Sequence, residues 1–118
     1  MLDRESFREY CLSKKSVTES FPFDEVTLVF KVAGKMFALT SLDTTDFRVN
    51  LKCDPEWAIE LREQYASIIP GWHMSKTHWN TVLVDGAFSR EFFKELVDHS
   101  YDLIVKSLTK KARFDAGL

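Results

Sequence analysis

Residues 47–52 constrain the fold most, because apolar and polar side chains alternate there without a break. Successive side chains of an extended strand point to opposite faces. The two sets are Phe47, Val49 and Leu51 on one face and Arg48, Asn50 and Lys52 on the other. Such a strand belongs to a sheet that is packed on one side and solvated on the other. The sequence therefore predicts a sheet with one covered face and one open face, and the open face is polar and basic.

Two further strands precede this one and are predicted to form a β-hairpin. Residues 26–32 and 35–41 are rich in β-branched and aromatic side chains, and Ala33-Gly34 between them is a two-residue turn. Alternation along the second strand places Phe37 and Leu39 on the same face.

The later strands lie in a stretch that is rich in tryptophan and histidine. Ile68-Ile69-Pro70-Gly71 is interpreted as the end of a helix and a turn, because proline and glycine interrupt regular structure. Residues 72–74 are a candidate for a short strand. Residues 79–84 predict a better one, which ends at the Asp85-Gly86 turn.

Three helices are predicted from capping residues and apolar periodicity. Asp3 caps a helix over residues 3–14, and Leu2 before it is placed to contact Phe7. Asp54-Pro55 begins a second helix. Ser89 caps the last one, whose apolar stripe runs to Leu108. Cations follow at its end, where the helix dipole favours them, and these are Lys110, Lys111 and Arg113.

The predicted order of elements is helix, three strands, helix, one or two strands, helix. Strands that follow one another as hairpins form an antiparallel sheet, so we expect an α+β fold: a two-layer sandwich with helices packed on one face of a mostly antiparallel sheet. The 118 residues fit a single domain over residues 1–118. Ten phenylalanines fill the core, and Cys11 and Cys53 are expected to be buried within it as free thiols.

Location and assembly follow from what the sequence lacks. The N-terminal residues are charged at once and contain no apolar signal segment. No apolar run is long enough to cross a bilayer. We therefore expect a cytoplasmic protein that makes no contact with membranes and is monomeric.

Four stretches together resemble the MmcQ/YjbR-like proteins, which are small bacterial domains with a frataxin-like (CyaY-like) α+β fold. They are Gly34-Lys-Met-Phe-Ala38, Leu51-Lys52 before Asp54-Pro55, Lys76-Thr-His-Trp-Asn-Thr-Val82 with Asp85-Gly86, and Ser100-Tyr101. The resemblance covers nearly the whole chain and depends on the order and spacing of these stretches. It implies the fold and a "double wing" DNA-binding motif, and it supplies no catalytic residue.

No motif for catalysis, a cofactor or a metal occurs. His73 and His78 lie in a region predicted to be strand and loop, where five-residue spacing does not bring two ligands to one ion. There is no P-loop and no GxGxxG. The first helix mixes Asp3, Glu5 and Glu9 with cations, so the acidic ridge with which frataxins bind iron is missing. We expect no cofactor, no metal and no catalysis; an enzyme would need a pocket with a perturbed acid, for which Glu19 is the candidate.

The first functional hypothesis is binding of double-stranded DNA by the open sheet face and the hairpin wings. Cations would contact phosphates, and an exposed indole would stack on a base or enter a base step. The predicted binding residues are Lys31, Lys35, Arg48, Lys52, Lys76, His78, Trp79 and Asn80. The opposing interpretation is a solvated sheet face with core tryptophans, and the net charge of −2 favours it.

The alternative hypothesis is a domain that binds a protein or a small ligand. Its pocket would be lined by Trp72, His73, His78 and Trp79, because aromatic walls with a few polar groups are typical of ligand sites.

Overall fold

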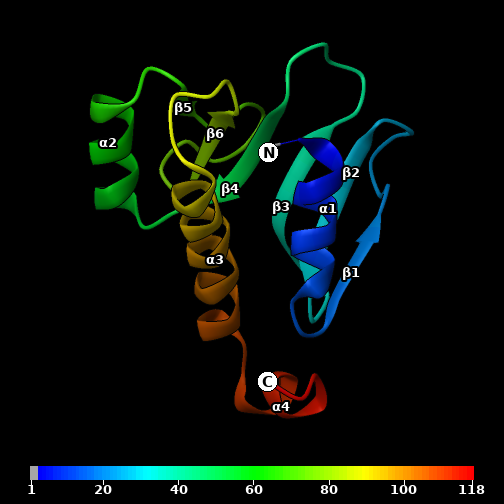
Figure 1. Ribbon diagram of the computed structural model, residues 1–118. Helices are drawn as coiled ribbons and strands as arrows, with labels where there is room; N and C mark the ends of the chain where they lie inside the picture. The colour runs from blue at the N-terminus through cyan, green and yellow to red at the C-terminus, as the bar shows by residue number, and fades with distance from the viewer. Residues whose placement is uncertain (1–2) are drawn as a thin grey trace.

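The computed structural model describes residues 3–118, so the expected contact of Leu2 lies outside the described residues (Figure 1). The helices are α1 (Arg4–Ser13), α2 (Pro55–Gln64), α3 (Arg90–Ser107) and α4 (Lys110–Asp115). The strands are β1 (Val17–Ser20), β2 (Thr27–Val32), β3 (Lys35–Ser41), β4 (Arg48–Lys52), β5 (Ile68–Pro70) and β6 (Trp79–Leu83).

The strands form one antiparallel sheet in the order β1-β2-β3-β4-β6-β5. Figure 1 shows α1 and α3 lying across one face of this sheet, and α3 contacts β2, β3 and β4 at its centre. The predicted α+β fold with a helix layer on an antiparallel sheet is confirmed. Within residues 3–118, no helix has the length and apolar character needed to span a bilayer.

The core lies between the sheet and the helices and is rich in phenylalanine. The Phe7 ring of α1 meets the Phe30 ring of β2 edge-on, with 5.5 Å between ring centroids, and it also packs beside Phe93 of α3. Edge-to-face contacts of this kind add to the gain from burying the rings. Cys11 and Cys53 are free and buried here, as expected. Burial raises the pKa of the Cys53 thiol to about 12 and also raises that of Cys11, so neither serves as a nucleophile near neutral pH.

The predicted helix starts are present, and a side chain caps each of them. Asp3 accepts the Ser6 amide at 2.7 Å, while Ser6 Oγ accepts the Asp3 amide at 3.3 Å, which makes a capping box. Asp54 accepts the Trp57 amide at 3.2 Å, and Pro55 occupies the first helical position after it.

The structure corrects the interpretation of residues 68–74. Ile68–Pro70 is not a helix end but the edge strand β5, which pairs with β6, and the helix before it already ends at Gln64. Proline is compatible with an edge strand because one side of such a strand has no partner. Residues 72–74 are turn rather than strand, so the pairing with β6 ends at Gly71, whose amide donates to the Trp79 carbonyl at 2.9 Å.

A β-bulge at Phe37 overturns the expectation that Phe37 and Leu39 share a face. Phe30 pairs with Ala38, but Lys31 pairs with Met36, so Phe37 has no partner in β2. One extra residue shifts the alternation by one step. Phe37 therefore enters the main core, whereas Leu39 lies in a small apolar cluster on the other side of the sheet.

The cations at the end of the chain lie on a separate helix, not on the last turn of α3. Leu108 has an extended backbone, and Thr109 then caps α4 by accepting the Ala112 amide at 3.0 Å. The Ser16 hydroxyl donates to the Ala116 carbonyl and ties α4 to the connection between α1 and β1. Lys110, Lys111 and Arg113 therefore lie beyond the end of α3.

Candidate ligand site on the open sheet face

The open face is presented by the residues that alternate with the core residues of each strand. In β4, half-buried Arg48, Asn50 and Lys52 alternate with buried Val49 and Leu51, as predicted. The pairing register extends this face to the neighbouring strands. Its further members are Thr27, Val29 and Lys31 of β2, Met36, Leu39 and Ser41 of β3, and Trp79, Thr81 and Leu83 of β6.

The connection between β5 and β6 folds back over this face and is fixed there by two hydrogen bonds, which a third bond within the sheet supports. The Trp72 amide donates to Thr81 Oγ1 at 2.9 Å, and the Trp72 carbonyl accepts from Asn50 Nδ2 at 3.1 Å. Thr81 Oγ1 in turn donates to Asn50 Oδ1 at 2.5 Å. Met74 of this connection packs on the cluster formed by Val29, Leu39 and Trp79. The connection therefore covers part of the open face. The backbone of Trp72, held by these bonds, forms a fixed wall beside the uncovered part.

A cleft of about 690 Å³ lies beside this wall. It is larger than the groove between α1 and α3, of about 290 Å³, and the groove beside Arg4 and Glu19, of about 430 Å³. Apolar side chains dominate its lining, and they are Phe23, Val26, Leu39, Trp72 and Met74. Phe23 and Trp72 are 63% and 59% exposed, so two large rings have no cover within the described part of the chain.

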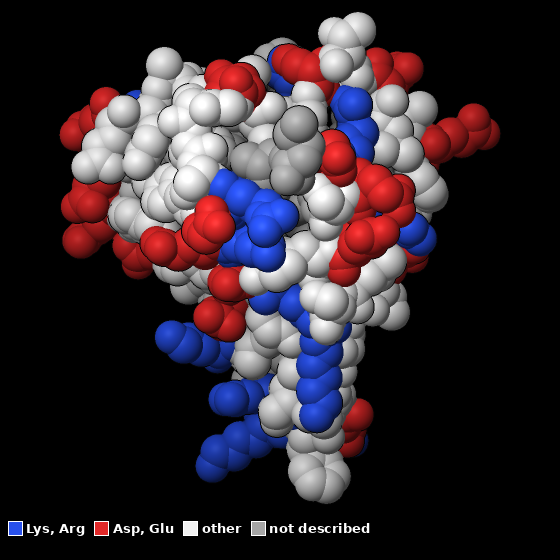
Figure 2. All heavy atoms as spheres, in the orientation of Figure 1, with Lys and Arg blue, Asp and Glu red and all other residues white. Residues whose placement is uncertain are grey.

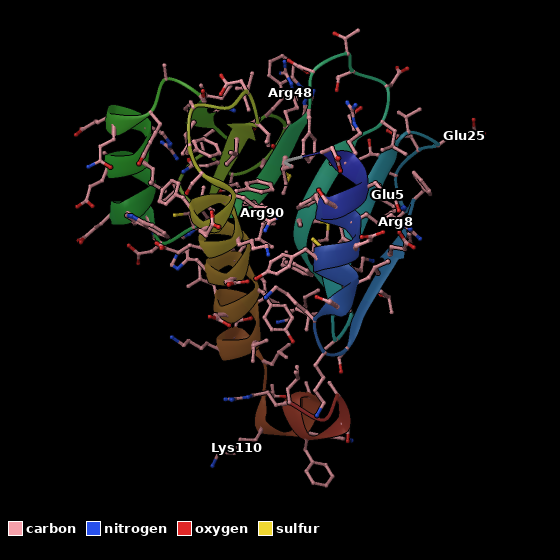
Figure 3. All side chains as sticks on the ribbon, in the orientation of Figure 1. Glu5, Arg8, Glu25, Arg48, Arg90 and Lys110 are labelled. Carbon is pink, nitrogen blue, oxygen red and sulfur yellow. The ribbon has the colours of Figure 1, made fainter. Side chains whose placement is uncertain are left out.

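Arg48 supplies the cationic group of the cleft and is already paired. Its Nε lies 3.1 Å from Asp46 Oδ1 and its Nη2 lies 2.5 Å from Asp46 Oδ2, a two-point contact. This contact lowers the pKa of Asp46 and raises that of Arg48. Figure 3 shows Arg48 at the end of the molecule opposite to Lys110.

His73 has a left-handed backbone conformation, with φ of 60°. A residue other than glycine holds this conformation at a cost of order 1 kcal/mol, which the surrounding contacts must offset. Here the Trp72 and His73 rings meet edge-on with 5.1 Å between centroids, and both side chains line the cleft. The strained turn therefore presents both rings at the cleft.

The structure brings together only part of the predicted nucleic-acid surface. Lys31, Arg48 and Lys52 share the open face, and Lys35 lies at the hairpin turn. Lys76 Nζ donates to the Gly71 carbonyl at 2.9 Å, and His78 is exposed directly before β6.

Two of the predicted contact residues are not accessible. Trp79 is only 8% exposed because Met74 and the connection before β6 cover it, so it has no free ring face for a base. Asn80 points to the helix-covered side, where its Oδ1 accepts from Arg62 Nε at 2.7 Å. That DNA is bound stays a prediction, and any contact surface excludes these two side chains.

Only part of the set of residues predicted to line a ligand pocket lies at the cleft. Trp72 and His73 line the cleft, whereas His78 and Trp79 do not. Sequence reasoning missed Phe23, Leu39 and Met74. The signal for Phe23 was available, since an apolar Phe21-Pro22-Phe23 run in a connection is unusual and predicts a contact site.

A group of cations lies together at another end of the molecule. The hairpin turn joins the end of α1 through the Ala33 amide and the Ser16 carbonyl, at 3.3 Å, and Ser16 also binds α4. Figure 2 shows basic side chains gathered at this end, while acidic ones dominate the upper part of the same face. The cationic end comprises Lys14, Lys15, Lys35, Lys106, Lys110, Lys111 and Arg113, of which Lys14 pairs with Asp98.

Chemistry beyond binding finds no support in the described residues. Within residues 3–118, no three His, Cys, Asp or Glu side chains converge in a way that could hold a metal ion. Glu19, the candidate for a perturbed acid, binds Arg8 through both carboxylate oxygens at 2.8 and 2.6 Å. This contact lowers its pKa, which is the opposite of what a general acid needs at neutral pH.

Two curated relatives and two solved structures resemble this chain over most of its length. The uncharacterized protein YbdF of Escherichia coli O157:H7 is 35% identical, with 93% of each chain covered. The uncharacterized protein YjbR of Escherichia coli strain K12 is 33% identical, with 89% of each covered. The crystal structure of Deinococcus radiodurans protein DR2400, with a DUF419 domain, has a TM-score of 0.91 and 42% identity over 97% of this chain and 87% of that one.

A crystal structure from Pseudomonas syringae has a TM-score of 0.75 and 27% identity over 86% of this chain and 98% of that one. The family model described as YjbR matches residues 12–103, which include β1 to β6 and most of α3. This match extends over most of the chain and includes the open sheet face and the connection that covers it. The chain therefore belongs to the YjbR family.

Proposed function

We propose that this protein is a non-catalytic binding domain whose cleft on the open sheet face takes a small organic ligand. The observation that carries the proposal is the cleft itself, with a volume of about 690 Å³ and two large exposed rings, Phe23 and Trp72, in its lining. Ligand pockets of a few hundred Å³ with aromatic walls and few polar groups are typical of small-molecule sites.

The fixed wall supports the same proposal. Two hydrogen bonds to Asn50 and Thr81, supported by a third between these two side chains, hold the Trp72 backbone against the sheet. A wall that is formed before binding loses little conformational entropy when a ligand arrives, so more of the contact energy appears as affinity. Exposure of the Trp72 ring leaves apolar surface for the ligand to bury, at roughly 25 cal/mol per Å².

The test is titration with phenylnaphthylamine, an uncharged fluorescent compound whose emission rises in apolar surroundings. We expect saturable binding to the native protein, weakened about tenfold by Trp72→Ala, which corresponds to about 1.4 kcal/mol of lost contact. Phe114→Ala is the matched control, because Phe114 is 83% exposed on α4, away from the cleft. Equal binding by the native protein and Trp72→Ala would overturn the proposal.

A second candidate function is binding of double-stranded DNA, now centred on the cationic end. Its specific support is that the hairpin tip with Lys35 and the helix α4 with Lys110 and Lys111 lie at one end, joined through Ser16. A hairpin tip and cations on a short helix are the elements that contact phosphates. On the open face, Lys31 and Lys52 make no ion pair within the described residues and would extend this surface.

This second candidate predicts steep salt dependence. Each phosphate contact contributes a slope of about −0.9 to log K against log salt. Duplex binding measured by fluorescence anisotropy should weaken after Lys110→Glu with Lys111→Glu and stay unchanged after Trp72→Ala. Absence of any salt-dependent binding at micromolar protein would remove the candidate, and loss after Trp72→Ala alone would move the contact surface to the cleft.

A further inference from the structure

Three side chains of the cleft keep free hydrogen-bond donors. Arg48 uses Nε and Nη2 for Asp46, and its Nη1 has no hydrogen bond within residues 3–118. Asn50 donates one Nδ2 hydrogen to Trp72 and retains the second. The His73 ring, likewise, makes no hydrogen bond with the described residues, so its N–H is available.

The carboxylate and hydroxyl groups around the cleft are partly engaged in hydrogen bonds. The Asp24 carboxylate accepts from the Val26 amide at 3.0 Å and from the Thr27 amide and hydroxyl at 2.7 and 3.1 Å. The Thr40 hydroxyl donates to the Arg48 carbonyl at 2.8 Å, and the Thr44 hydroxyl donates to the Asp46 carbonyl at 2.8 Å. A ligand in this cleft therefore meets free N–H donors, one of which belongs to a guanidinium.

Apolar side chains make up much of the rest of the lining. The exposed Trp72 indole and the Phe23 ring are joined by Leu39, Val26 and Met74. Methionine adapts its shape to a ring placed against it, and sulfur–aromatic contacts are favourable. A planar aromatic body can place its face against these rings and the methionine side chain.

We propose that the ligand of the cleft is a flat aromatic acid, with its ionised group on the free edge of Arg48 and its ring on the apolar lining that includes Trp72. This inference rests on the proposed ligand-binding function and adds the chemical class. Asp46 sets the affinity, because its carboxylate competes with the ligand for the same guanidinium.

The experiment compares two fluorescent probes that differ by one charged group. Anilinonaphthalenesulfonate carries a sulfonate in place of the ligand's carboxylate, and phenylnaphthylamine is its uncharged counterpart. The native protein should bind the anion about tenfold more tightly, as expected for one charge-assisted hydrogen bond in a partly exposed site. Amide and side-chain NMR shifts at Asn50 and Trp72 should report both probes.

Three variants assign the preference to Arg48. Arg48→Met should remove the preference for the anion, so that the two probes bind with similar affinity, whereas Asp46→Asn should strengthen anion binding several-fold by removing the competing carboxylate. Lys111→Met removes an exposed cation outside the cleft and should change neither probe. Melting temperatures identify any variant that has lost its fold, and Asp46→Asn, which should gain affinity, is informative even if Arg48→Met unfolds.

The outcomes separate this inference from the proposed function. Equal affinity of the native protein for the two probes, or a preference for the anion that survives Arg48→Met, would overturn the inference that the ligand is an aromatic acid. If Trp72→Ala nevertheless loses both probes, the proposal of a ligand-binding cleft would still hold. Binding of both probes away from Asn50 and Trp72 would overturn the inference and the proposed function together.

Discussion

Ser100 joins the helix layer to the sheet through a single hydroxyl group. Its Oγ donates to the Phe37 carbonyl at 2.5 Å and accepts from the Lys52 amide at 2.9 Å. The pairing of β3 with β4 ends at Ala38 and Leu51, so the Phe37 carbonyl and the Lys52 amide just beyond it need a partner from elsewhere. The side chain is fully buried on α3 and supplies that partner.

Ser100→Ala should therefore lower the free energy of unfolding by about 1–3 kcal/mol, because it leaves a buried N–H and a buried C=O without partners. Urea unfolding followed by circular dichroism measures the change. Ser107→Ala is the matched control, since the exposed Ser107 hydroxyl only caps the Ile104 carbonyl of its own helix. A loss no larger than that of the control would contradict the bridging role.

His99 should make stability fall as the solution becomes mildly acidic. Its Nε2 accepts the Asp54 amide at 3.0 Å, and burial lowers its pKa below the ordinary value of 6.5. A group with a lowered folded pKa of this type is stabilising when neutral, so its contribution is fully present above the unfolded pKa of about 6.5 and is lost as pH falls from there through the lowered folded pKa. The free energy of unfolding should therefore decrease as pH falls below about 6.5.

His99→Gln should flatten that decrease, because an amide oxygen accepts the Asp54 N–H at every pH. Carboxylates with lowered pKa values, such as Asp24 and Asp85, titrate at lower pH and do not contribute to the onset of this decrease. An unchanged slope in the variant would assign the pH dependence to other groups.

At the scale of elements, most of the fold follows from local patterns, and the candidate site does not. Capping residues gave the starts of α1, α2 and α3, and alternation gave β4, since both signals lie within a few residues. The cleft depends on the connection between β5 and β6 lying across distant strands. That placement comes from contacts such as Asn50 with Trp72, 22 residues apart, which no local period reveals.

The bulge and the short edge strand escaped prediction for a related reason. Phe37 and Leu39 fit an unbroken alternation, and only the mismatch with the register of β2 shows the extra residue. Ile68–Pro70 has only three residues and contains a proline, so pairing with β6 rather than its own propensity makes it a strand.

Gly71 is the residue at which the connection between β5 and β6 leaves the sheet. A side chain at this position should not be tolerated. A Cβ there would lie 2.8 Å from Trp79 Cβ and 2.9 Å from the Trp79 carbonyl oxygen. Gly71→Ala should cost about 1–3 kcal/mol and weaken phenylnaphthylamine binding, because the wall that carries Trp72 must shift. Thermal unfolding and the probe titration measure the two effects.

Gly86→Asn provides the comparison. Gly86 has a φ of 88°, but a Cβ added there would have no neighbour within 4 Å, and asparagine tolerates left-handed backbone better than most residues. It should leave probe binding unchanged. Similar losses of binding in the two variants would show that any strained turn, rather than contact at Gly71, disturbs the cleft.

The whole molecule separates two kinds of surface. Arg48 lies at one end of the molecule and Lys110 at the opposite end (Figure 3). The cleft offers rings and donors, whereas the cationic end offers closely spaced positive charge on α4 and the hairpin turn. A near-neutral net charge of −2 hides this division, because the acidic residues are concentrated elsewhere, as Figure 2 shows for one face.

If both surfaces bind, they should do so independently. Saturating phenylnaphthylamine should change duplex affinity by less than about twofold, since no described contact joins Trp72 to α4 and coupling needs an element that both sites bias. Anisotropy titrations with and without the probe measure this. Added salt should weaken binding of duplex DNA and leave binding of the neutral probe unaffected. If salt weakened both, the duplex and the probe would share one surface.

The wall of the cleft belongs to the connection between β5 and β6, which adds no strand to the sheet. Changes in the length and composition of that connection would alter what the cleft accepts while the order of the strands stays the same. Homologous proteins that keep this scaffold would then diverge in ligand preference through one interchangeable segment, and the comparison of residues 71–78 among relatives is where such divergence would be visible.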